Sequence, residues 1–313
     1  MRETIKWSYD LLAPEEQNLL RQLAVFAGGF TVEAAEAVGG RSDILTENAF
    51  NDKDLKTTAD RQPPIASCPP PPVLDLLTSL VEKNLLAQKE QTGGDVRLQL
   101  LEVVREFAFE CLESSGELAA ARRKHAWYFL GLAEKAEPHL VGEDSAAWLD
   151  KLEAENDNLR AALNESLPND IDAAARLTAA LRYFWTNRSY IKEGRERLEA
   201  VLKQGRELPT ALRFKLLNGL GLYARNQGDY ETARRVYEEG LAEGDAAGDL
   251  RQLVIVHHGL AALAKRQGDF TAAQEFHEKE LAFSRRMNDE NNIAIALASL
   301  GDLALVKGEI AKA

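Results

Sequence analysis

One spacing in the C-terminal half of the sequence constrains the fold more than any other feature. Three segments repeat at steps of 40 residues: Leu220-Gly221 … Gln227-Gly228-Asp229-Tyr230 … Ala233, Leu260-Ala261 … Gln267-Gly268-Asp269-Phe270 … Ala273, and Leu300-Gly301 … Lys307-Gly308-Glu309-Ile310 … Ala313. A fainter copy has Asn187-Arg188-Ser189-Tyr190 in the same phase, and its second helix, with Gly194, Leu198 and Leu202, fits after a one-residue slip. Such a period predicts stacked helix pairs, because one pair alone cannot bury its apolar side.

The chemistry of each copy predicts how a helix pair is made. The first helix is apolar at helical spacing, at Leu216, Leu217, Leu220 and Ala224. Gly228 can adopt the left-handed conformation that closes this helix. Asp229 can then accept hydrogen bonds from the free N–H groups that begin the second helix. We also expect Tyr230 and Phe270 to pack between the two helices, and Ala233 and Ala273 to allow their close approach.

The remaining sequence predicts two further regions. Residues 1–116 contain short helices and a hairpin, in which Leu85-Leu86-Ala87 and Val96–Leu100 flank Thr92-Gly93-Gly94-Asp95, and this order is typical of a winged-helix-like domain. Residues 40–72 are polar, end in four prolines, and are predicted to be a disordered insertion. Residues 117–168 form a helical connector and residues 169–313 the repeats. The predicted fold is mainly α, a winged-helix-like domain with a small β-hairpin followed by an α-solenoid.

Two family resemblances follow from these motifs. The Leu-Gly pair, the Gly-Asp-Tyr turn and the alanine three residues later resemble the tetratricopeptide repeat, with a period longer than usual. The whole chain except the insertion resembles the bacterial signal-transduction ATPases with numerous domains, relatives of the apoptotic and plant-resistance ATPases. The matching segments are Ile5–Leu12, Leu23–Phe30, Leu80–Leu86, Leu101–Ala108 and Glu155–Leu163.

That second resemblance implies a nucleotide-binding module upstream of the winged helix. The present chain has no Gly-x-x-x-x-Gly-Lys-Ser/Thr phosphate loop, so ATP binding transfers to none of its residues. The array also stops at Ala313, in the middle of a repeat and without a polar cap. We therefore expect the chain to be a fragment or truncated.

Charge and composition limit the kinds of partner and the cellular location that the sequence predicts. The chain has 38 Lys and Arg against 50 Asp and Glu, a net charge of −12, and residues 1–116 have 11 against 19, a net of −8. A DNA-reading surface is usually basic, so DNA contact through the helix at 73–83 or through Arg97 in the wing is a weaker alternative. No apolar stretch predicts a membrane span or a signal peptide. Cys68 and Cys111 cannot form a disulfide framework, so we expect a cytoplasmic chain with free thiols.

No set of residues predicts catalysis, a cofactor or a metal site. His257 and His258 are adjacent and point about 100° apart on a helix, so one is expected to be packed and the other to face solvent, whereas metal pairs prefer i, i+4 spacing. His277-Glu278 lacks the second histidine of a zinc-protease helix, and His125, beside Arg122, Arg123 and Lys124, is expected on a solvated helix face.

The repeats offer the candidate binding site. In tetratricopeptide arrays the first helix of each pair lines the concave face, and the register places a mildly basic, hydrogen-bonding stripe there: Asn218, Arg225, Asn226, His258, Lys265 and Arg266. The predicted function is a regulatory sensor and scaffold that binds a protein, peptide or small-molecule effector on this stripe. An ordinary solvated helix face, a free-standing tetratricopeptide adaptor and a DNA-binding winged-helix regulator remain the alternatives.

Overall fold

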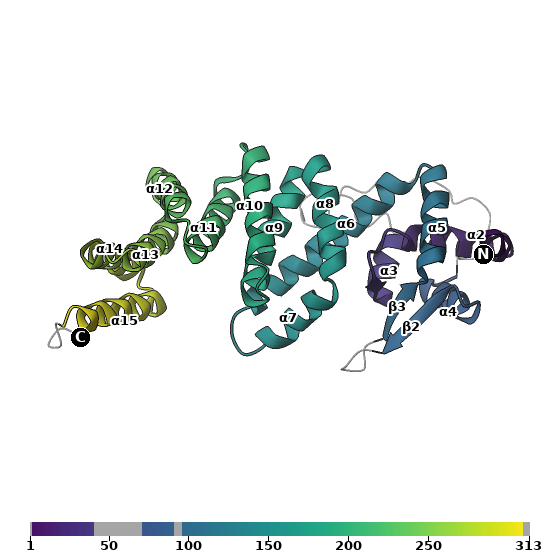
Figure 1. Cartoon of the computed structure of the whole chain (residues 1–313), viewed down its shortest axis with the longest axis horizontal. Helices are drawn as coiled ribbons and strands as arrows, with labels where there is room; N and C mark the ends of the chain where they lie inside the picture. The colour runs from purple at the N-terminus through teal and green to yellow at the C-terminus, as the bar shows by residue number, and fades with distance from the viewer. Residues whose placement is uncertain (1, 41–70, 91–95, 309–313) are drawn as a thin grey trace, which may run out of the picture. The chain divides into compact units, whose positions relative to one another are not determined.

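The computed structural model describes residues 2–40, 71–90 and 96–308, which form two compact units. The first unit comprises Met1–Lys135 and Asp150–Pro168, and the second comprises Ala136–Leu149 and Asn169–Ala313 (Figure 1). Residues 117–135 thus belong to the first unit, together with the segment predicted as a winged-helix-like domain. Residues 41–70 of the insertion predicted over 40–72, and the glycine turn predicted over 92–95, lie outside the described residues.

The first unit is helical with one small sheet. Its helices are α1 (Arg2–Asp10), α2 (Pro14–Leu23), α3 (Val32–Gly39), α4 (Val73–Glu82), α5 (Glu102–Ser114), α6 (Leu118–Ala136), the end of α7 (Ser145–Ala154) and α8 (Asn156–Asn169). Thr31 is the N-cap of α3, because its hydroxyl accepts a hydrogen bond from the Ala34 N–H at 3.2 Å.

The predicted hairpin is confirmed and gains a third strand. β2 (Leu86–Glu90) and β3 (Val96–Leu100) are antiparallel, with Leu86 opposite Leu100. A two-residue strand, β1 (Gly29–Phe30), pairs with the other edge of β3, so the strand order is β1-β3-β2. Because β1 is so short, the alternation of side chains gives no signal for it in the sequence.

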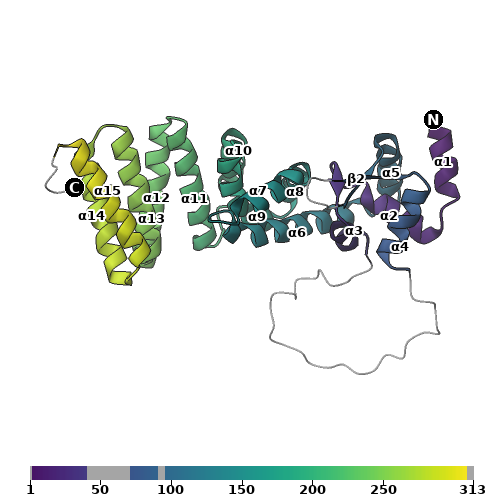
Figure 2. The same cartoon turned by 90° about the horizontal axis from the view of Figure 1, so that it is seen from below.

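The second unit is an array of helix pairs. Its helices are α9 (Ile171–Asn187), α10 (Ile191–Gln204), α11 (Thr210–Asn226), α12 (Tyr230–Ala247), α13 (Leu250–Arg266), α14 (Phe270–Met287) and α15 (Glu290–Val306). Within this unit the helices follow one another side by side (Figure 2). α11, α13 and α15 begin at steps of 40 residues, whereas α9 begins 39 residues before α11. The first copy is therefore one residue out of phase along its whole length, including the turn for which the sequence suggested the same phase.

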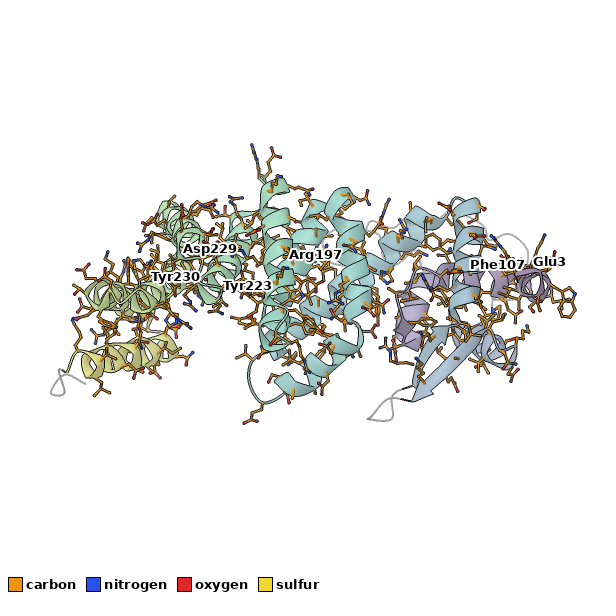
Figure 3. All side chains as sticks on the ribbon, viewed as in Figure 1. Glu3, Phe107, Arg197, Tyr223, Asp229 and Tyr230 are labelled. Carbon is orange, nitrogen blue, oxygen red and sulfur yellow. The ribbon has the colours of Figure 1, made fainter. Side chains whose placement is uncertain are left out.

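The turns between the helices are confirmed as predicted. Gly228 and Gly268 have φ of 81° and 79°, in the left-handed region. The Asp229 carboxylate accepts from the Thr232 N–H at 3.1 Å, and Asp269 accepts from the Ala272 N–H at 2.9 Å. Figure 3 shows Asp229 and Tyr230 where α12 begins.

Adjacent repeats are also joined by a polar contact that recurs in register. Arg195 of α10 donates to Gln227 at 2.9 Å and to Asp229 at 2.5 Å in the next turn. Forty residues after that turn, Gln267 accepts from Arg234 of α12 at 2.8 Å. In the third copy the donor and acceptor exchange places, because Lys307 donates to Gln274 at 2.8 Å. We call these contacts the inter-repeat clasps.

Candidate functional site

The six predicted binding residues, which we call the first-helix stripe, lie on α11 and α13. Asn226, His258, Lys265 and Arg266 are exposed, and Asn218 and Arg225 are half-buried. Asn218 and Arg225 are seven residues apart on α11, and His258 and Lys265 have the same spacing on α13, so each pair shares one helix face. The structure thus brings these residues to equivalent faces of two helices, while their role in binding stays a prediction.

The stripe changes character at α15. In the 40-residue register, the α15 positions equivalent to Asn218, Arg225 and Asn226 of α11 are Ala298, Leu305 and Val306. Leu305 and Val306 are 57% and 55% exposed. Asp302 of α15 lies 4.0 Å from the ammonium of Lys265, and the two side chains are 70% and 42% exposed. The cationic surface of α13 is therefore followed by exposed apolar residues that sequence reasoning did not include, although the same register would have found them.

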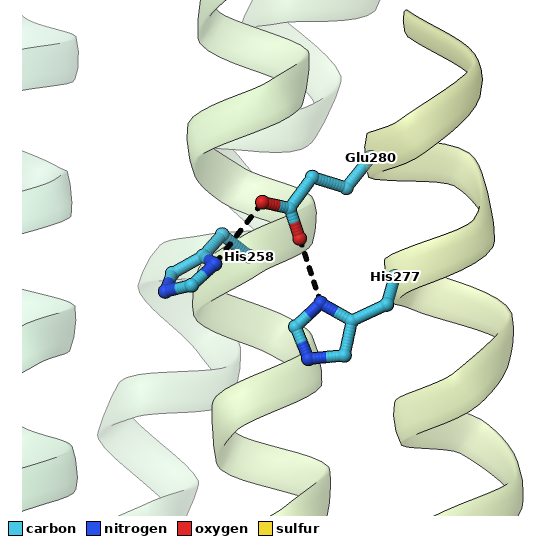
Figure 4. Close-up of side chains that lie close together, drawn as sticks. All are labelled: His258, His277 and Glu280. Carbon is cyan, nitrogen blue, oxygen red and sulfur yellow. Dashed lines mark hydrogen bonds and ion pairs between the residues drawn. The ribbon is translucent and has the colours of Figure 1, made fainter. Parts of the chain in front are cut away.

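The histidines of the second unit gather in a way that the sequence analysis only partly predicted. His257 is buried and His258 is exposed, which confirms that one packs and the other meets solvent. The sequence pairs His277 with Glu278 in an incomplete zinc-protease pattern. In the structure His277 is buried, and its Nδ1 lies 2.7 Å from the Glu280 carboxylate. The other oxygen of Glu280 lies 3.1 Å from Nδ1 of His258 (Figure 4). We call His258, His277 and Glu280 the histidine–glutamate cluster.

A second polar network is buried in the first unit and corrects two expectations. Arg97, the wing residue considered for DNA contact, is 8% exposed and forms an ion pair with Glu155, the turn residue between α7 and α8. Its guanidinium also donates to the Gly29 carbonyl at 2.6 Å. Arg97 therefore joins the sheet to the turn before α8 and presents no cation to a DNA groove.

His125 is the second correction, because it is buried and does not lie on a solvated face. Its Nε2 lies 3.3 Å from the Asn158 side-chain oxygen, which also accepts from the Ala27 N–H at 2.8 Å. Burial lowers the pKa of His125 from 6.5 to about 4, and the hydrogen bond to Asn158 only partly opposes this shift. The ring is neutral at pH 7 and packs against Phe26 and Phe129.

The helix in the DNA-reading position presents an acidic surface. Asp75 and Glu82 are exposed on α4, and the exposed Lys83 that follows is held by Glu16 at 2.5 Å. Ser79 donates to the same Glu16 carboxylate at 2.6 Å. Apart from Lys83, the α4 segment offers no basic side chain to a phosphate backbone.

Among the described helices, none is long and apolar enough to cross a bilayer.

Comparison with known proteins gives relatives but no family model, since none matches the chain. Two proteins, of Mycobacterium tuberculosis and Mycobacterium bovis, are each described as a "Putative HTH-type transcriptional regulator" and are 33% identical over 222 residues. The match covers 69% of this chain and 22% of each relative, so the chain spans about a fifth of their length. An uncharacterised protein of M. tuberculosis is 34% identical over 125 residues, covering 39% of this chain and 26% of that protein.

One of the solved structures that match the chain has a low similarity to it. It is a signal-transduction ATPase with numerous domains that has a tetratricopeptide repeat sensor, from Pyrococcus horikoshii. The TM-score is 0.45 and the sequence identity 15%, with 96% of this chain and 42% of that chain covered.

Proposed function

We propose that this chain is the sensor and scaffold segment of a signal-transduction ATPase that controls transcription, and that the first-helix stripe binds its effector. The ATPase module would precede Met1 in the full-length, cytoplasmic protein, and the chain itself would perform no catalysis. The motif resemblance supports the ATPase context, and the description of the mycobacterial relatives as transcriptional regulators supports the link to transcription.

The observation that carries the proposal is the mixed character of the stripe. Lys265 and Arg266 are exposed cations in an acidic protein, and Leu305 and Val306 extend the same register with exposed apolar side chains. A ligand that matches both parts has carboxylates and apolar groups within a short distance. An acidic segment of a protein or peptide with interspersed leucine or aromatic residues has this chemistry.

The first unit, which we interpret as winged-helix-like, supplies the proposed route of signalling. Arg97 joins the sheet to Glu155, the turn residue directly before α8, so a displacement of α8 would also move the sheet. We take effector binding to shift the population of the attached ATPase module between a closed and an open state. This step requires that the effector prefers one of the two states.

A peptide-binding experiment tests the stripe. A library of acidic peptides, with and without leucine and phenylalanine, is titrated with the whole chain and followed by fluorescence anisotropy. Lys265→Glu/Arg266→Glu should weaken the best peptide by at least about tenfold, the effect of losing roughly 1.4 kcal/mol of charge pairing. Arg235→Glu/Arg285→Glu is the matched control, because both residues are exposed on the second helices α12 and α14 and the charge change is the same. Equal weakening by both variants would contradict the placement on the stripe.

The two alternative functions have separate tests. A phosphate loop encoded upstream of Met1 would exclude a free-standing adaptor. For the DNA-binding alternative, supported by the relatives' description, the buried Arg97 is no longer a suitable probe. Lys89 of β2 is exposed. Duplex DNA binding at low salt that Lys89→Glu abolishes would support a DNA role, and the absence of binding at low salt would dismiss it.

A further inference from the structure

The histidine–glutamate cluster is an unusual arrangement for the interior of a helical repeat. His258 is on α13, and His277 and Glu280 are one turn apart on α14 (Figure 4). One nitrogen or oxygen from each residue lies within 4.8 Å of the others. His277 and Glu280 are buried, whereas the His258 side chain is 46% exposed, so one side of the cluster faces solvent.

The carboxylate at the centre of the cluster is ionised at neutral pH. Burial by itself would raise the pKa of Glu280, but hydrogen bonds from His258 and His277 outweigh burial and hold the pKa below its ordinary value. Lys279, its neighbour in sequence, lies with its ammonium 5.8 Å from the centre of the Phe276 ring. A negative charge is thus enclosed at 1% exposure beside two imidazole rings, and buried charges are normally paired or bound to metals.

The fold does not require this cluster, as the preceding repeat shows. Forty residues earlier, the positions of His258, His277 and Glu280 are occupied by Asn218, Tyr237 and Gly240. Tyr237 is buried and packs among apolar residues that include Val256 and Leu260. The same place in the helix pair is therefore filled without any charged group, which leaves the three polar side chains at α13 and α14 without a packing reason.

We propose that His258, His277 and Glu280 bind a divalent transition-metal ion of the Zn²⁺ type. Two histidine nitrogens and one carboxylate oxygen form a recognised ligand set for such ions, with bonds of about 2.0–2.2 Å. Ligand atoms around a tetrahedral ion lie about 3.3–3.5 Å apart at those bond lengths. Nδ1 of His277 lies 2.7 Å from one Glu280 oxygen, and Nδ1 of His258 lies 3.1 Å from the other. One ligand atom from each residue lies within 4.8 Å of the other two. Rotation of the exposed His258 ring can bring its nitrogen closer to the oxygen that His277 contacts.

The cluster can bind the ion after a proton moves within each imidazole ring. A neutral imidazole carries its proton on one nitrogen, and a shift of that proton from Nδ1 to Nε2 leaves the Nδ1 lone pair free for the metal. The proton moves within each ring and none is lost from it, so the tautomer shift balances within the cluster. Three protein ligands leave a fourth position on the exposed side of His258, where water or a carboxylate from another molecule can bind. The site stands independently of the proposed effector, although His258 is part of the stripe.

Zinc titration of the whole chain, with any affinity tag removed, tests the proposal. The probe is Zn²⁺ alone, measured by calorimetry and by competition with a coloured chelator. We expect one ion per chain at this site. His258→Asn, which restores the residue type of Asn218, and Glu280→Gln should each weaken binding at least about tenfold, since even outer-sphere changes cost 10–100-fold.

The control and the overturning results are equally specific. His139→Asn removes an exposed histidine elsewhere in the second unit and should leave the affinity unchanged. His258→Asn acts at an exposed position, so helical circular dichroism should confirm that the variant is folded. Failure of the wild-type chain to bind a stoichiometric ion would overturn the proposal, and so would equal affinities of the wild type and folded His258→Asn. In either case the cluster is a hydrogen-bonded group only.

Discussion

Two neighbouring repeats fill the equivalent buried position with different kinds of side chain, an aromatic ring in one and a polar cluster in the other. In the first, the ring of Tyr237 is 2% exposed and lies directly over two glycines, so that a Cβ built on Gly221 or Gly259 would come within 2.5 or 2.7 Å of it. In the second, the equivalent residue is His277, and Glu280 replaces Gly240. We call these the Tyr237 seam and the His277 seam. The comparison shows that the repeat period fixes where a side chain is buried but not whether it serves packing or chemistry.

The largest expected effect is at the Tyr237 seam. Tyr237→Ala should lower the free energy of unfolding by about 3–5 kcal/mol, because it removes a buried aromatic ring between two helices. His277→Ala should cost less, about 1–3 kcal/mol, since the main loss is a hydrogen-bond partner of a buried carboxylate. Urea unfolding in the presence of a metal chelator measures both. Equal costs at the two seams would mean that the His277 seam is packed as tightly as the Tyr237 seam.

Next in size is a pH effect that separates two kinds of buried histidine. His277 faces a carboxylate, whereas His125 in the first unit faces only an amide oxygen. The pKa of His125 falls from 6.5 to about 4 on folding, so the unfolded chain binds the proton more tightly. The contribution of the neutral His125 ring to the free energy of unfolding is therefore fully present above pH 6.5 and is lost as the pH falls towards 4. At pH 5 the loss is about 2 kcal/mol.

His125→Phe isolates this contribution. The variant keeps an aromatic ring beside Phe26 and Phe129, and the Asn158 oxygen keeps its bond from the Ala27 N–H. The difference in unfolding free energy between the variant and the wild type should shift in favour of the variant by about 2 kcal/mol from pH 7 to pH 5. A difference that is constant over this range would show that His125 does not resist protonation.

A smaller effect compares two glycines that occupy the same place in successive first helices. An added methyl group at Gly259 would meet the Tyr237 ring at 2.7 Å, whereas one at Gly219 would meet Leu198 at 3.4 Å. Gly259→Ala should destabilise the chain by about 1–3 kcal/mol through overpacking. Gly219→Ala should instead be neutral or stabilising, by up to about 1 kcal/mol of helix propensity. Thermal unfolding of the two variants side by side decides whether the ring of Tyr237 is as confined as its contacts indicate.

The smallest expected effect concerns the caps that the two repeats share. Asp229→Ala removes an N-cap bond and the contact with Arg195, whereas the bonds shown for Asp269 are those of the cap. The first change should cost about 1–2 kcal/mol and Asp269→Ala about 1 kcal/mol, because a partly exposed ion pair adds little. Chemical denaturation measures the difference, and a larger cost for Asp269→Ala would reverse the expected order.

The sequence predicts features whose causes lie within a few residues. Gly228 and Asp229 act on the helix ends beside them, so the repeat turns and caps could be predicted from spacing alone. The ion pair of Arg97 with Glu155 joins residues 58 positions apart, and no local pattern reports it. The burial of His125 could have been predicted, because it lies four residues before Phe129 on the apolar stripe of α6. Its three basic neighbours in the sequence indicated a solvated face instead.

The histidine–glutamate cluster falls between these cases. His277 and Glu280 are three residues apart, so their proximity on a helix is visible in the sequence. The contact with His258, 22 residues earlier, depends on how α13 and α14 cross. The register offered a clue, because position 277 corresponds to Tyr237, and an ionisable residue at a core position of a repeat is a departure worth testing.

The inter-repeat clasps have a mechanical consequence. Arg195, Arg234 and Lys307 each join one helix pair to its immediate neighbour, so a force that separates the helix pairs acts on each clasp together with the apolar packing beside it. Under load such a chain of links yields at its softest joint while the others stay closed. We expect the array to open first at a clasp with a single contact, Arg234–Gln267 or Lys307–Gln274, and last at Arg195, which donates to both Gln227 and Asp229.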